Sequence, residues 1–179
     1  MYTKEYIEQL QSLHNDPRRT KGFGGKVKDL GQFHSFMNEW NPRSLLDYGC
    51  GKGHILAYLK ETYPNTKCVG YDPAVPMFSK LTDKSFECVF SNDVLEHVEP
   101  DMIDKVLEHI DLCSTKYIWL RIDTLPARKK LPDGRNAHLL IQNKKWWKRK
   151  LTHFINGSIF YFELNKKGKL DVAISKVNP

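Results

Sequence analysis

Short apolar runs alternate with amphipathic segments along the chain, which is the pattern of a sheet covered by helices. The apolar runs predict six strands, at about residues 44–48, 67–71, 86–91, 116–122, 158–164 and 170–176. Apolar residues spaced by three and four positions predict helices at about residues 4–13, 27–40, 54–62, 100–112 and 143–151. Because strands and helices alternate through most of the chain, we predict an α/β fold with a Rossmann-like, doubly wound sheet.

The segment at residues 44–60 combines the end of a strand, a glycine-rich turn and the start of a helix. It reads Ser-Leu-Leu-Asp-Tyr-Gly-Cys-Gly-Lys-Gly-His-Ile-Leu-Ala-Tyr-Leu-Lys. Glycines allow backbone conformations closed to other residues, so a ligand can approach the main chain closely. The free N–H groups of the following helix add a positive end. A dinucleotide-binding turn has the spacing G-x-G-x-x-G, whereas Gly49, Gly51 and Gly53 have the spacing G-x-G-x-G, with Asp47 before them.

Three further segments accompany this turn in the same order as in a known family. They are Val-Gly-Tyr-Asp-Pro at 69–73, a run at 86–98 that includes Asn-Asp-Val-Leu-Glu-His, and Leu-Pro-Asp-Gly-Arg-Asn-Ala-His at 131–138. Together they resemble the class I S-adenosylmethionine-dependent methyltransferases, in a compact group found in bacteria and phages. The resemblance covers roughly residues 23–151. It implies a single methyltransferase domain over residues 1–179, with S-adenosylmethionine as methyl donor and S-adenosylhomocysteine as product.

The interval between the second and third predicted strands departs from the family pattern. Only 13 residues separate Asp72 from Phe86, too few for the helix, strand and helix that the full fold places there. We therefore expect six strands with one edge strand missing, mostly parallel, with one antiparallel strand near the C-terminus. The residue that usually contacts the adenine amino group is lost with that strand, so residues 74–82 should recognise adenine instead.

The resemblance also implies which residues bind the cofactor. Asp47 would orient the glycine turn and bind the methionine amino group, although it could also be only a turn-forming residue. Asp72 ends the second strand 19 residues after Gly53, near the offset at which an acidic residue accepts hydrogen bonds from ribose hydroxyls. Cys50 is expected to contribute packing and backbone contacts. The expected cofactor set is Asp47, Gly49, Cys50, Gly51, Asp72, Pro73, Asn92, Asp93 and Val94.

Residues 124–142 form a long connection, which we expect to act as the active-site loop, since long loops in compact domains are usually functional. His138 is the only histidine in it and is the candidate general base, because imidazole titrates near neutral pH. His97 is a second candidate, although the family uses this position mostly for structure. Asp93-Val94-Leu95-Glu96 differs from the Asn or Asp, Pro-Pro and aromatic motif of DNA amino-methyltransferases. Methylation of DNA amino groups is therefore disfavoured.

Two flanking segments leave alternatives open. The predicted helices within residues 1–40 would cover the cofactor side. The one at 27–40 could instead only pack against the core. Residues 144–150 place five cations around Trp146 and Trp147. Trp147 and Leu151 should dock on the sheet, while Trp146 could stack on a base or ring.

The net charge of +7 is concentrated in one part of the chain. Residues 121–179 contain 14 lysines and arginines against 4 acidic residues, whereas the first 120 residues contain 14 against 17. Such asymmetry indicates an anionic partner. Arg121, Arg128 and Arg135 are the candidates for binding it, together with Lys129 and Lys130.

These observations favour a methyltransferase acting on a small-molecule or nucleotide-like, anionic acceptor. An RNA methyltransferase and a cofactor-binding module without transferase activity remain alternatives. The four cysteines lack a C-x-x-C pair, which argues against a zinc site and a disulfide framework, and we expect no metal. No apolar run approaches roughly 18 residues and the N-terminus lacks a signal-peptide pattern, so we expect a cytoplasmic protein without membrane contact. The sequence does not indicate an oligomeric state.

Overall fold

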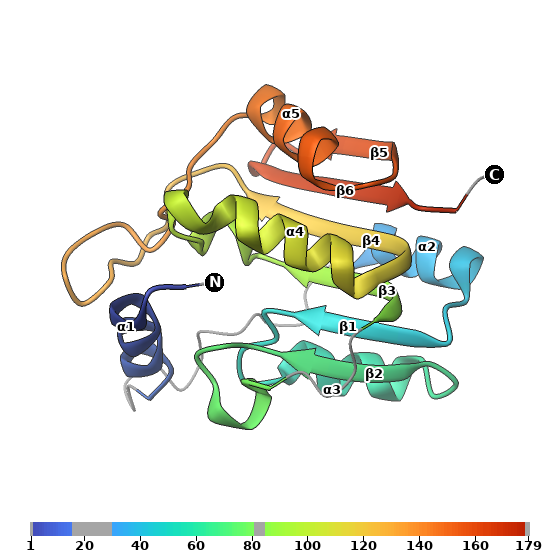
Figure 1. Ribbon diagram of the computed structural model, residues 1–179, viewed down its shortest axis with the longest axis horizontal. Coiled ribbons are helices and arrows are strands. Elements are labelled where there is room, and N and C mark those ends of the chain that lie inside the picture. Colours follow the sequence, from blue (N-terminus) through green and yellow to red (C-terminus); the bar gives the residue numbers. More distant parts are fainter. Residues whose placement is uncertain (1, 16–29, 81–84, 178–179) are drawn as a thin grey trace.

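The computed structural model describes residues 2–15, 30–80 and 85–177, and within them a six-stranded sheet forms the centre of the molecule (Figure 1). Strands β1 to β4 are parallel, and β6 is antiparallel to both of its neighbours, β4 and β5. This confirms the prediction of six strands with one antiparallel strand near the C-terminus. The strands, in the order β2-β1-β3-β4-β6-β5, are β1 (Ser44–Tyr48), β2 (Lys67–Tyr71), β3 (Phe86–Asn92), β4 (Ser114–Asp123), β5 (Ser158–Leu164) and β6 (Lys169–Ser175).

The described residues form five α-helices around the sheet, and short 3₁₀ turns lie in the connections (Figure 1). The α-helices are α1 (Lys4–Asn15), α2 (Gly31–Trp40), α3 (His54–Thr62), α4 (Ile103–Cys113) and α5 (Lys144–Phe154). The 3₁₀ turns are η2 (Pro76–Phe78), η3 (Leu95–His97) and η4 (Pro100–Met102). None of the described helices combines the length and apolar character that a bilayer-spanning helix needs.

The two faces of the sheet carry separate apolar cores, as the alternation of side chains along β4 illustrates. Ile118 and Leu120 face the core shared with α4 and α5, whereas Trp119 faces the core shared with α2 and α3. Trp147 of α5 is fully buried in the first of these cores, together with Leu151. This confirms the predicted docking of Trp147 and Leu151 on the sheet. Trp146 packs edge-on against Trp147 and lies near the Lys150 ammonium.

Helix α2 packs into the core. Phe33, Phe36 and Met37 are buried against the sheet, and Phe33 contacts Phe90 and Trp119 ring to ring. The predicted helix began at residue 27, but residues 27–29 lie outside the described part of the chain. Of the two alternatives for this segment, packing against the core is the one that the described residues adopt.

Helix α1 packs against the loop at 124–142 and forms a third apolar cluster at the carboxyl end of the parallel strands (Figure 1). Tyr6, Leu10 and Leu13 are buried against Leu131 and Ala137 of the loop. The start of the helix is fixed by bonds from the Thr3 N–H and hydroxyl to the Glu99 carboxylate, at 2.9 and 2.7 Å. The N-terminal helix therefore lies over the same end of the sheet as the loop.

The loop itself is internally bonded. Lys130 and Asn136 form an isolated antiparallel bridge. The Asn136 amide accepts a bond from the Ala127 N–H at 3.0 Å and donates one to the Ala127 carbonyl at 2.9 Å. The Asn136 side chain thus replaces some of the backbone hydrogen bonds that a regular hairpin would have. It also sets the position of His138, which follows Ala137.

Candidate functional site

A cavity of about 590 Å³ opens at the carboxyl ends of the parallel strands. The chain runs from β1 to β2 on one side and then crosses to β3 on the other, so the strand order reverses beside β1. Open α/β sheets bind ligands at such a reversal, because the two loops diverge and leave a crevice. The volume lies within the range of small-molecule sites. All nine residues of the expected cofactor set line this cavity: Asp47, Gly49, Cys50, Gly51, Asp72, Pro73, Asn92, Asp93 and Val94.

The glycine turn leaves β1 in left-handed backbone conformations, with φ of +83° at Gly49 and +53° at Gly51. A Cβ atom on Gly49 would lie 2.4 Å from a methyl carbon of Val94, so only glycine fits there without a shift. Backbone bonds from Gly49 and Cys50 to the Tyr71 carbonyl, at 2.7 and 3.1 Å, tie the turn to β2. The turn is therefore packed against the segments on both sides of β1.

Asp72 contributes to the turn as well as to the cavity. Its Oδ2 accepts a bond from the Gly51 N–H at 2.9 Å, and its Oδ1 accepts one from the Ala74 N–H at 2.9 Å. The bonds that hold the turn within the described residues come from Asp72 and the Tyr71 carbonyl, and the expected role of Asp47 in orienting the turn stays a prediction. A carboxylate has about four acceptor sites, so two remain at Asp72 for hydroxyl groups of a ligand.

Asp47 lies at the base of the cavity and is 2% exposed. Its Oδ2 atom has no hydrogen-bond partner among the described residues. Burial, together with the negative charge of Asp72, raises the pKa of Asp47 to about 7. A buried carboxyl oxygen without a partner is costly, so this position suits a ligand that brings a cationic donor.

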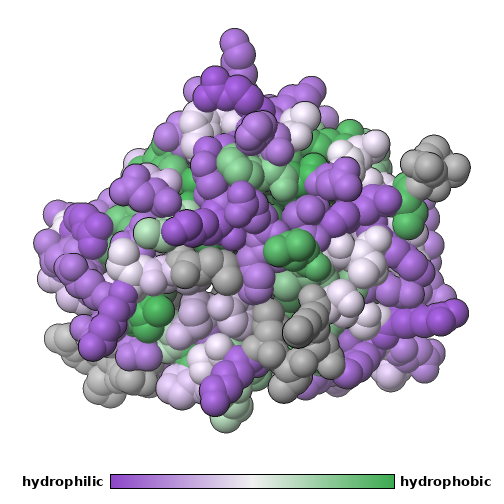
Figure 2. Space-filling view, viewed as in Figure 1, coloured by the Kyte–Doolittle hydropathy of each residue, from purple (hydrophilic) through white to green (hydrophobic). Residues whose placement is uncertain are grey.

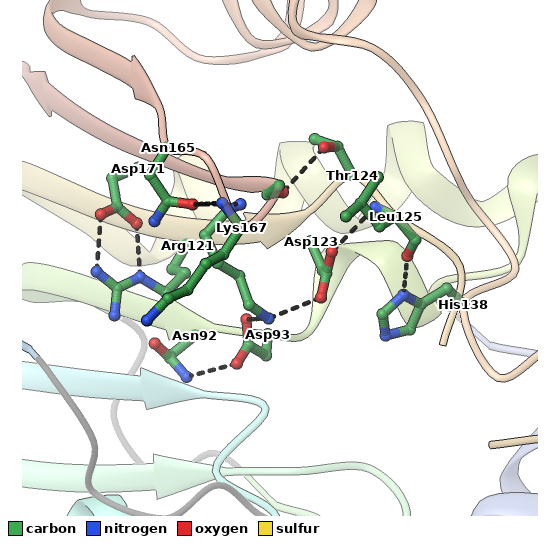
Figure 3. Close-up of polar contacts among 12 residues, drawn as sticks. Asn92, Asp93, Arg121, Asp123, Thr124, Leu125, His138, Asn165, Lys167 and Asp171 are labelled. Carbon is green, nitrogen blue, oxygen red and sulfur yellow. Dashed lines mark hydrogen bonds and ion pairs between the residues drawn. The ribbon is translucent and has the colours of Figure 1, made fainter. Parts of the chain in front are cut away.

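The segment after β3 is held by the start of β6 (Figure 3). Asp93 has a left-handed φ of +55° and receives the Lys169 ammonium at 2.8 Å. The same ammonium pairs with Asp123 at 2.8 Å. Burial alone would lower the pKa of Lys169, but Asp123 and Asp93 together raise it. The side-chain oxygen of Asn92 is buried without a partner among the described residues, and it is a second acceptor in the cavity wall.

His97 and His138 both line the cavity, and their rings meet edge-on with centroids 4.8 Å apart. His97 Nδ1 lies 2.7 Å from the Ala137 carbonyl, and His138 Nδ1 lies 2.5 Å from the Leu125 carbonyl. Since a carbonyl only accepts, each ring carries its proton at Nδ1 and, when neutral, its lone pair at Nε2. Burial, and secondarily the neighbouring His138, lower the pKa of His97 to about 4.

The three arginines predicted to bind an anion have different surroundings. Arg128 lines the cavity. Arg121 does not, because it forms a two-bond ion pair with Asp171, its cross-strand neighbour on β6, at 2.6 and 2.7 Å (Figure 3). Arg135 pairs with Asp133 at 2.6 Å on the outside of the loop. The charges of Arg121 and Arg135 are therefore matched within the fold, and anion binding by these two residues stays a prediction.

Several cavity residues were not predicted from the sequence. Tyr2, Tyr6 and Leu10 of the N-terminal segment form one side of the cavity. Their spacing of four indicates a helix face, but not the surface that it covers. Lys169 enters because β6 runs antiparallel to the other strands, so that its first residue lies at their carboxyl ends. Glu96, next to the predicted His97, is fully buried and also lines the cavity.

The expected adenine segment is only partly described. Residues 74–80 contribute no lining residue, and Ala74 is instead buried against α1 and the loop. Residues 81–84 lie outside the described part of the chain. Within the described residues, Pro73 is therefore the cavity residue that follows Asp72 along this connection.

The fold and this site define a class I S-adenosylmethionine-dependent methyltransferase: a glycine turn after β1, an acidic residue ending β2 and an Asn-Asp pair ending β3 converge on one cavity. Comparison with family profiles matches residues 18–162 to the methyltransferase domain family. The chain belongs to this family. None of the curated proteins compared with the chain matches it.

Solved structures share the fold at low sequence identity. A 1,6-didemethyltoxoflavin-N1-methyltransferase from Burkholderia thailandensis, crystallised with its substrate and S-adenosylhomocysteine, aligns with a TM-score of 0.67 and 16% identity over 97% of this chain and 90% of that chain. DhpI in complex with S-adenosylhomocysteine aligns with a TM-score of 0.62 and 14% identity over 96% of this chain and 97% of that chain. Human N-acetylserotonin methyltransferase in complex with S-adenosylmethionine aligns with a TM-score of 0.58 and 14% identity over 97% of this chain. This chain spans 56% of the human enzyme, and 55% of each of two other O-methyltransferase-related structures.

Proposed function

We propose that the protein transfers a methyl group from S-adenosylmethionine to a small, anionic acceptor. The observation that carries the proposal is the convergence in one cavity of two buried acidic side chains, Asp47 and Asp72, around a glycine turn at the strand-order reversal. When bound, the cofactor supplies a sulfonium whose methyl carbon is electrophilic.

The residues around the glycine turn fit the two ends of the cofactor. Asp47 offers the methionine ammonium a buried oxygen that has no hydrogen-bond partner in the part of the chain that the structure describes. Asp72 offers its remaining acceptor sites to the ribose hydroxyls. Gly49 and Gly51 have no side chains, so a ligand can lie directly against the backbone of the turn. The side chain of Asn92 adds a further buried acceptor beside them.

We assign the part of the cavity lined by His97, His138, Arg128 and Lys129 to the acceptor, and we call it the acceptor half. His138 presents its Nε2 lone pair and is placed to take a proton from a hydroxyl acceptor, since its Nδ1 is bonded to Leu125. Arg128 and Lys129 supply positive charge for an anion. The toxoflavin and N-acetylserotonin methyltransferases among the structural neighbours are named for small-molecule substrates, which supports an acceptor of this size.

Titration calorimetry with S-adenosylhomocysteine tests the cofactor site. We expect one molecule bound per chain with micromolar affinity, and a raised melting temperature, because the ligand binds only the native state. Asp72→Ala removes two acceptor sites and the bond to the glycine turn, so it should weaken binding by about 2–4 kcal/mol, or roughly 30- to 800-fold. Asp101→Ala removes an exposed carboxylate outside the cavity and serves as the control.

The result that would sink the assignment is wild-type protein that binds no S-adenosylhomocysteine, or Asp72→Ala that binds it as tightly as Asp101→Ala. Thermal unfolding of both variants shows whether any loss comes from unfolding. A cofactor-binding module without transferase activity would pass this test but would release no S-adenosylhomocysteine from S-adenosylmethionine with any acceptor.

A further inference from the structure

We propose that Glu96, His97 and His138 form a binding site for a divalent transition-metal ion, of which Zn²⁺ is the representative, in the acceptor half of the cavity. One ligand atom from each of the three residues lies within 4.8 Å of the others. Glu96 and His97 are adjacent in η3, and His138 comes from the loop after β4. The site does not depend on methyl transfer.

The donor set has the chemistry of a catalytic rather than a structural metal site. Two imidazoles and one carboxylate bind Zn²⁺ and related first-row ions, and three protein ligands leave a coordination position for water or substrate. Structural zinc sites instead close the coordination shell with four ligands, mostly cysteines. All three side chains line the cavity, so an ion held by them faces the space where the acceptor would lie.

The two histidines already have the tautomer and orientation that a metal ligand needs. Each Nδ1–H is donated to a backbone carbonyl, that of Ala137 for His97 and that of Leu125 for His138. Metal-binding histidines typically donate their second ring nitrogen in this way, which fixes the ring and directs the lone pair at the ion. Figure 3 shows His138 with one ring nitrogen at the Leu125 carbonyl and the other pointing away from it.

Glu96 supplies an independent indication, because its carboxyl group is fully buried with neither oxygen hydrogen-bonded to a described residue. A buried carboxyl group without a partner is unfavourable, and a bound cation would remove the cost.

Neighbouring residues hold the backbone of His97 and Glu96, and the charges around them favour a cation. The Tyr6 hydroxyl donates to the His97 carbonyl, and the Leu140 N–H donates to the Glu96 carbonyl at 2.9 Å. The Lys169 ammonium is already matched by Asp93 and Asp123. With Glu96 ionised, this polar cluster has three carboxylates against one ammonium.

The sequence analysis expected no metal, because the cysteines lack metal-ligand spacing. The proposed ligands have no recognisable spacing either, since two are adjacent and the third lies beyond a strand and most of a loop. With an ion bound, the Nε2 lone pair of His138 would coordinate the ion. The ion could then lower the pKa of a water or hydroxyl group at its open coordination position. Without an ion, His138 keeps its lone pair as a base.

The test is metal binding by the full-length, untagged protein after removal of metal with a chelator and in the absence of cofactor. Zn²⁺ is titrated by calorimetry, and Co²⁺ by its visible absorption, which reports coordination. We expect one ion per chain and a loss of affinity of at least about 100-fold in Glu96→Gln and in His138→Ala, since even outer-shell partners contribute 10- to 100-fold. His153→Ala changes an exposed histidine of α5 and should leave binding unchanged.

Three results would overturn the proposal. They are no stoichiometric metal binding by wild type, wild-type affinity in both Glu96→Gln and His138→Ala, or a loss of affinity in His153→Ala equal to theirs. His138 is half-buried in the loop, so His138→Ala keeps the test informative should Glu96→Gln fail to fold. Because the measurement needs neither cofactor nor acceptor, its failure leaves the proposed methyltransferase function unaffected, and the reverse also holds.

Discussion

Asp47 and Asp72 lie at the carboxyl ends of neighbouring strands and line the same cavity, yet their surroundings differ. Asp72 accepts bonds from two backbone N–H groups, whereas the Oδ2 atom of Asp47 has no partner among the described residues. The ionised form of Asp47 is therefore destabilised by burial, and further by the charge of Asp72. A cationic group of a ligand would reverse this effect, so the cost at Asp47 is removed when such a ligand binds.

Asp47→Asn should stabilise the ligand-free protein at high pH while weakening S-adenosylhomocysteine binding. The folded-state pKa of Asp47 is about 7, against 3.8 for the free side chain. Because the folded state binds the proton more tightly, this group makes the protein less stable as pH rises from about 4 to 7. The gain for Asp47→Asn should be on the order of 4 kcal/mol at pH 8 and less than half of that at pH 5.

The measurement is the free energy of unfolding of variant and wild type at the two pH values. Comparison at each pH cancels the contributions of other titrating groups. A difference that does not change between pH 5 and pH 8, or a variant less stable than wild type at pH 8, would contradict the account of Asp47.

At the scale of elements, the glycine turn and the loop at 124–142 both contain a glycine with left-handed backbone, but in different surroundings. Gly49 has a φ of +83° and lies against Val94, whereas Gly134 has a φ of +89° and has open space where a Cβ would be. The two positions therefore separate the cost of backbone conformation from the cost of crowding.

Gly49→Ala should cost about 1–2 kcal/mol for its left-handed backbone and a further 1–3 kcal/mol for the clash with Val94. Gly134→Ala should cost only the first amount. Denaturant unfolding measures both, and calorimetry should show weakened S-adenosylhomocysteine binding for Gly49→Ala alone. Val94→Ala in the Gly49→Ala background should recover part of the stability. Equal costs at the two glycines would show that the close approach to Val94 is unimportant.

Over the whole molecule, positive charge occurs in two separate places within the C-terminal third. Arg128 and Lys129 line the cavity, while Lys145, Lys148 and Arg149 of α5 border a shallow surface hollow that includes none of the cavity residues. Hydrophilic side chains lie among apolar ones on the upper part of the surface, where Figure 1 places α5 (Figure 2). An anionic small acceptor requires only the first group, whereas an RNA acceptor would use the second as well.

Arg128→Glu with Lys129→Glu should lower kcat/KM for an anionic acceptor and flatten its dependence on salt. Lys145→Glu with Lys148→Glu changes the net charge equally and is the matched control. Charges more than about 8 Å from the acceptor are largely screened at physiological ionic strength, so the control should behave as wild type. The measurement is kcat/KM at increasing salt for whichever acceptor turns over, together with binding of a labelled single-stranded RNA. Equal losses in both variants would favour RNA, and no loss in either would show that the cavity cations are only a solvated surface.

The sequence by itself determined the features that depend on neighbouring residues or on the direction of parallel strands. Apolar runs indicated all six strands, and the short interval before Phe86 indicated the missing edge strand. The nine expected cofactor residues were named from the resemblance to the methyltransferase family, and they line one cavity because the carboxyl ends of parallel strands meet at one edge of the sheet. His97 and His138 were found by their positions in the segments that follow strands.

Only the tertiary structure decided which charges are matched and which polar groups are left without partners. Arg121 pairs with Asp171 because the register of β4 and β6 places them opposite each other, across 50 positions of sequence. Among the described residues the Oδ2 atom of Asp47 has no hydrogen-bond partner, Glu96 lies beside His138, and α1 packs against the loop, and each of these depends on how distant segments are placed. A side chain's charge, pKa and ligand depend on the groups packed around it, and those groups are set by strand register and helix docking rather than by local pattern.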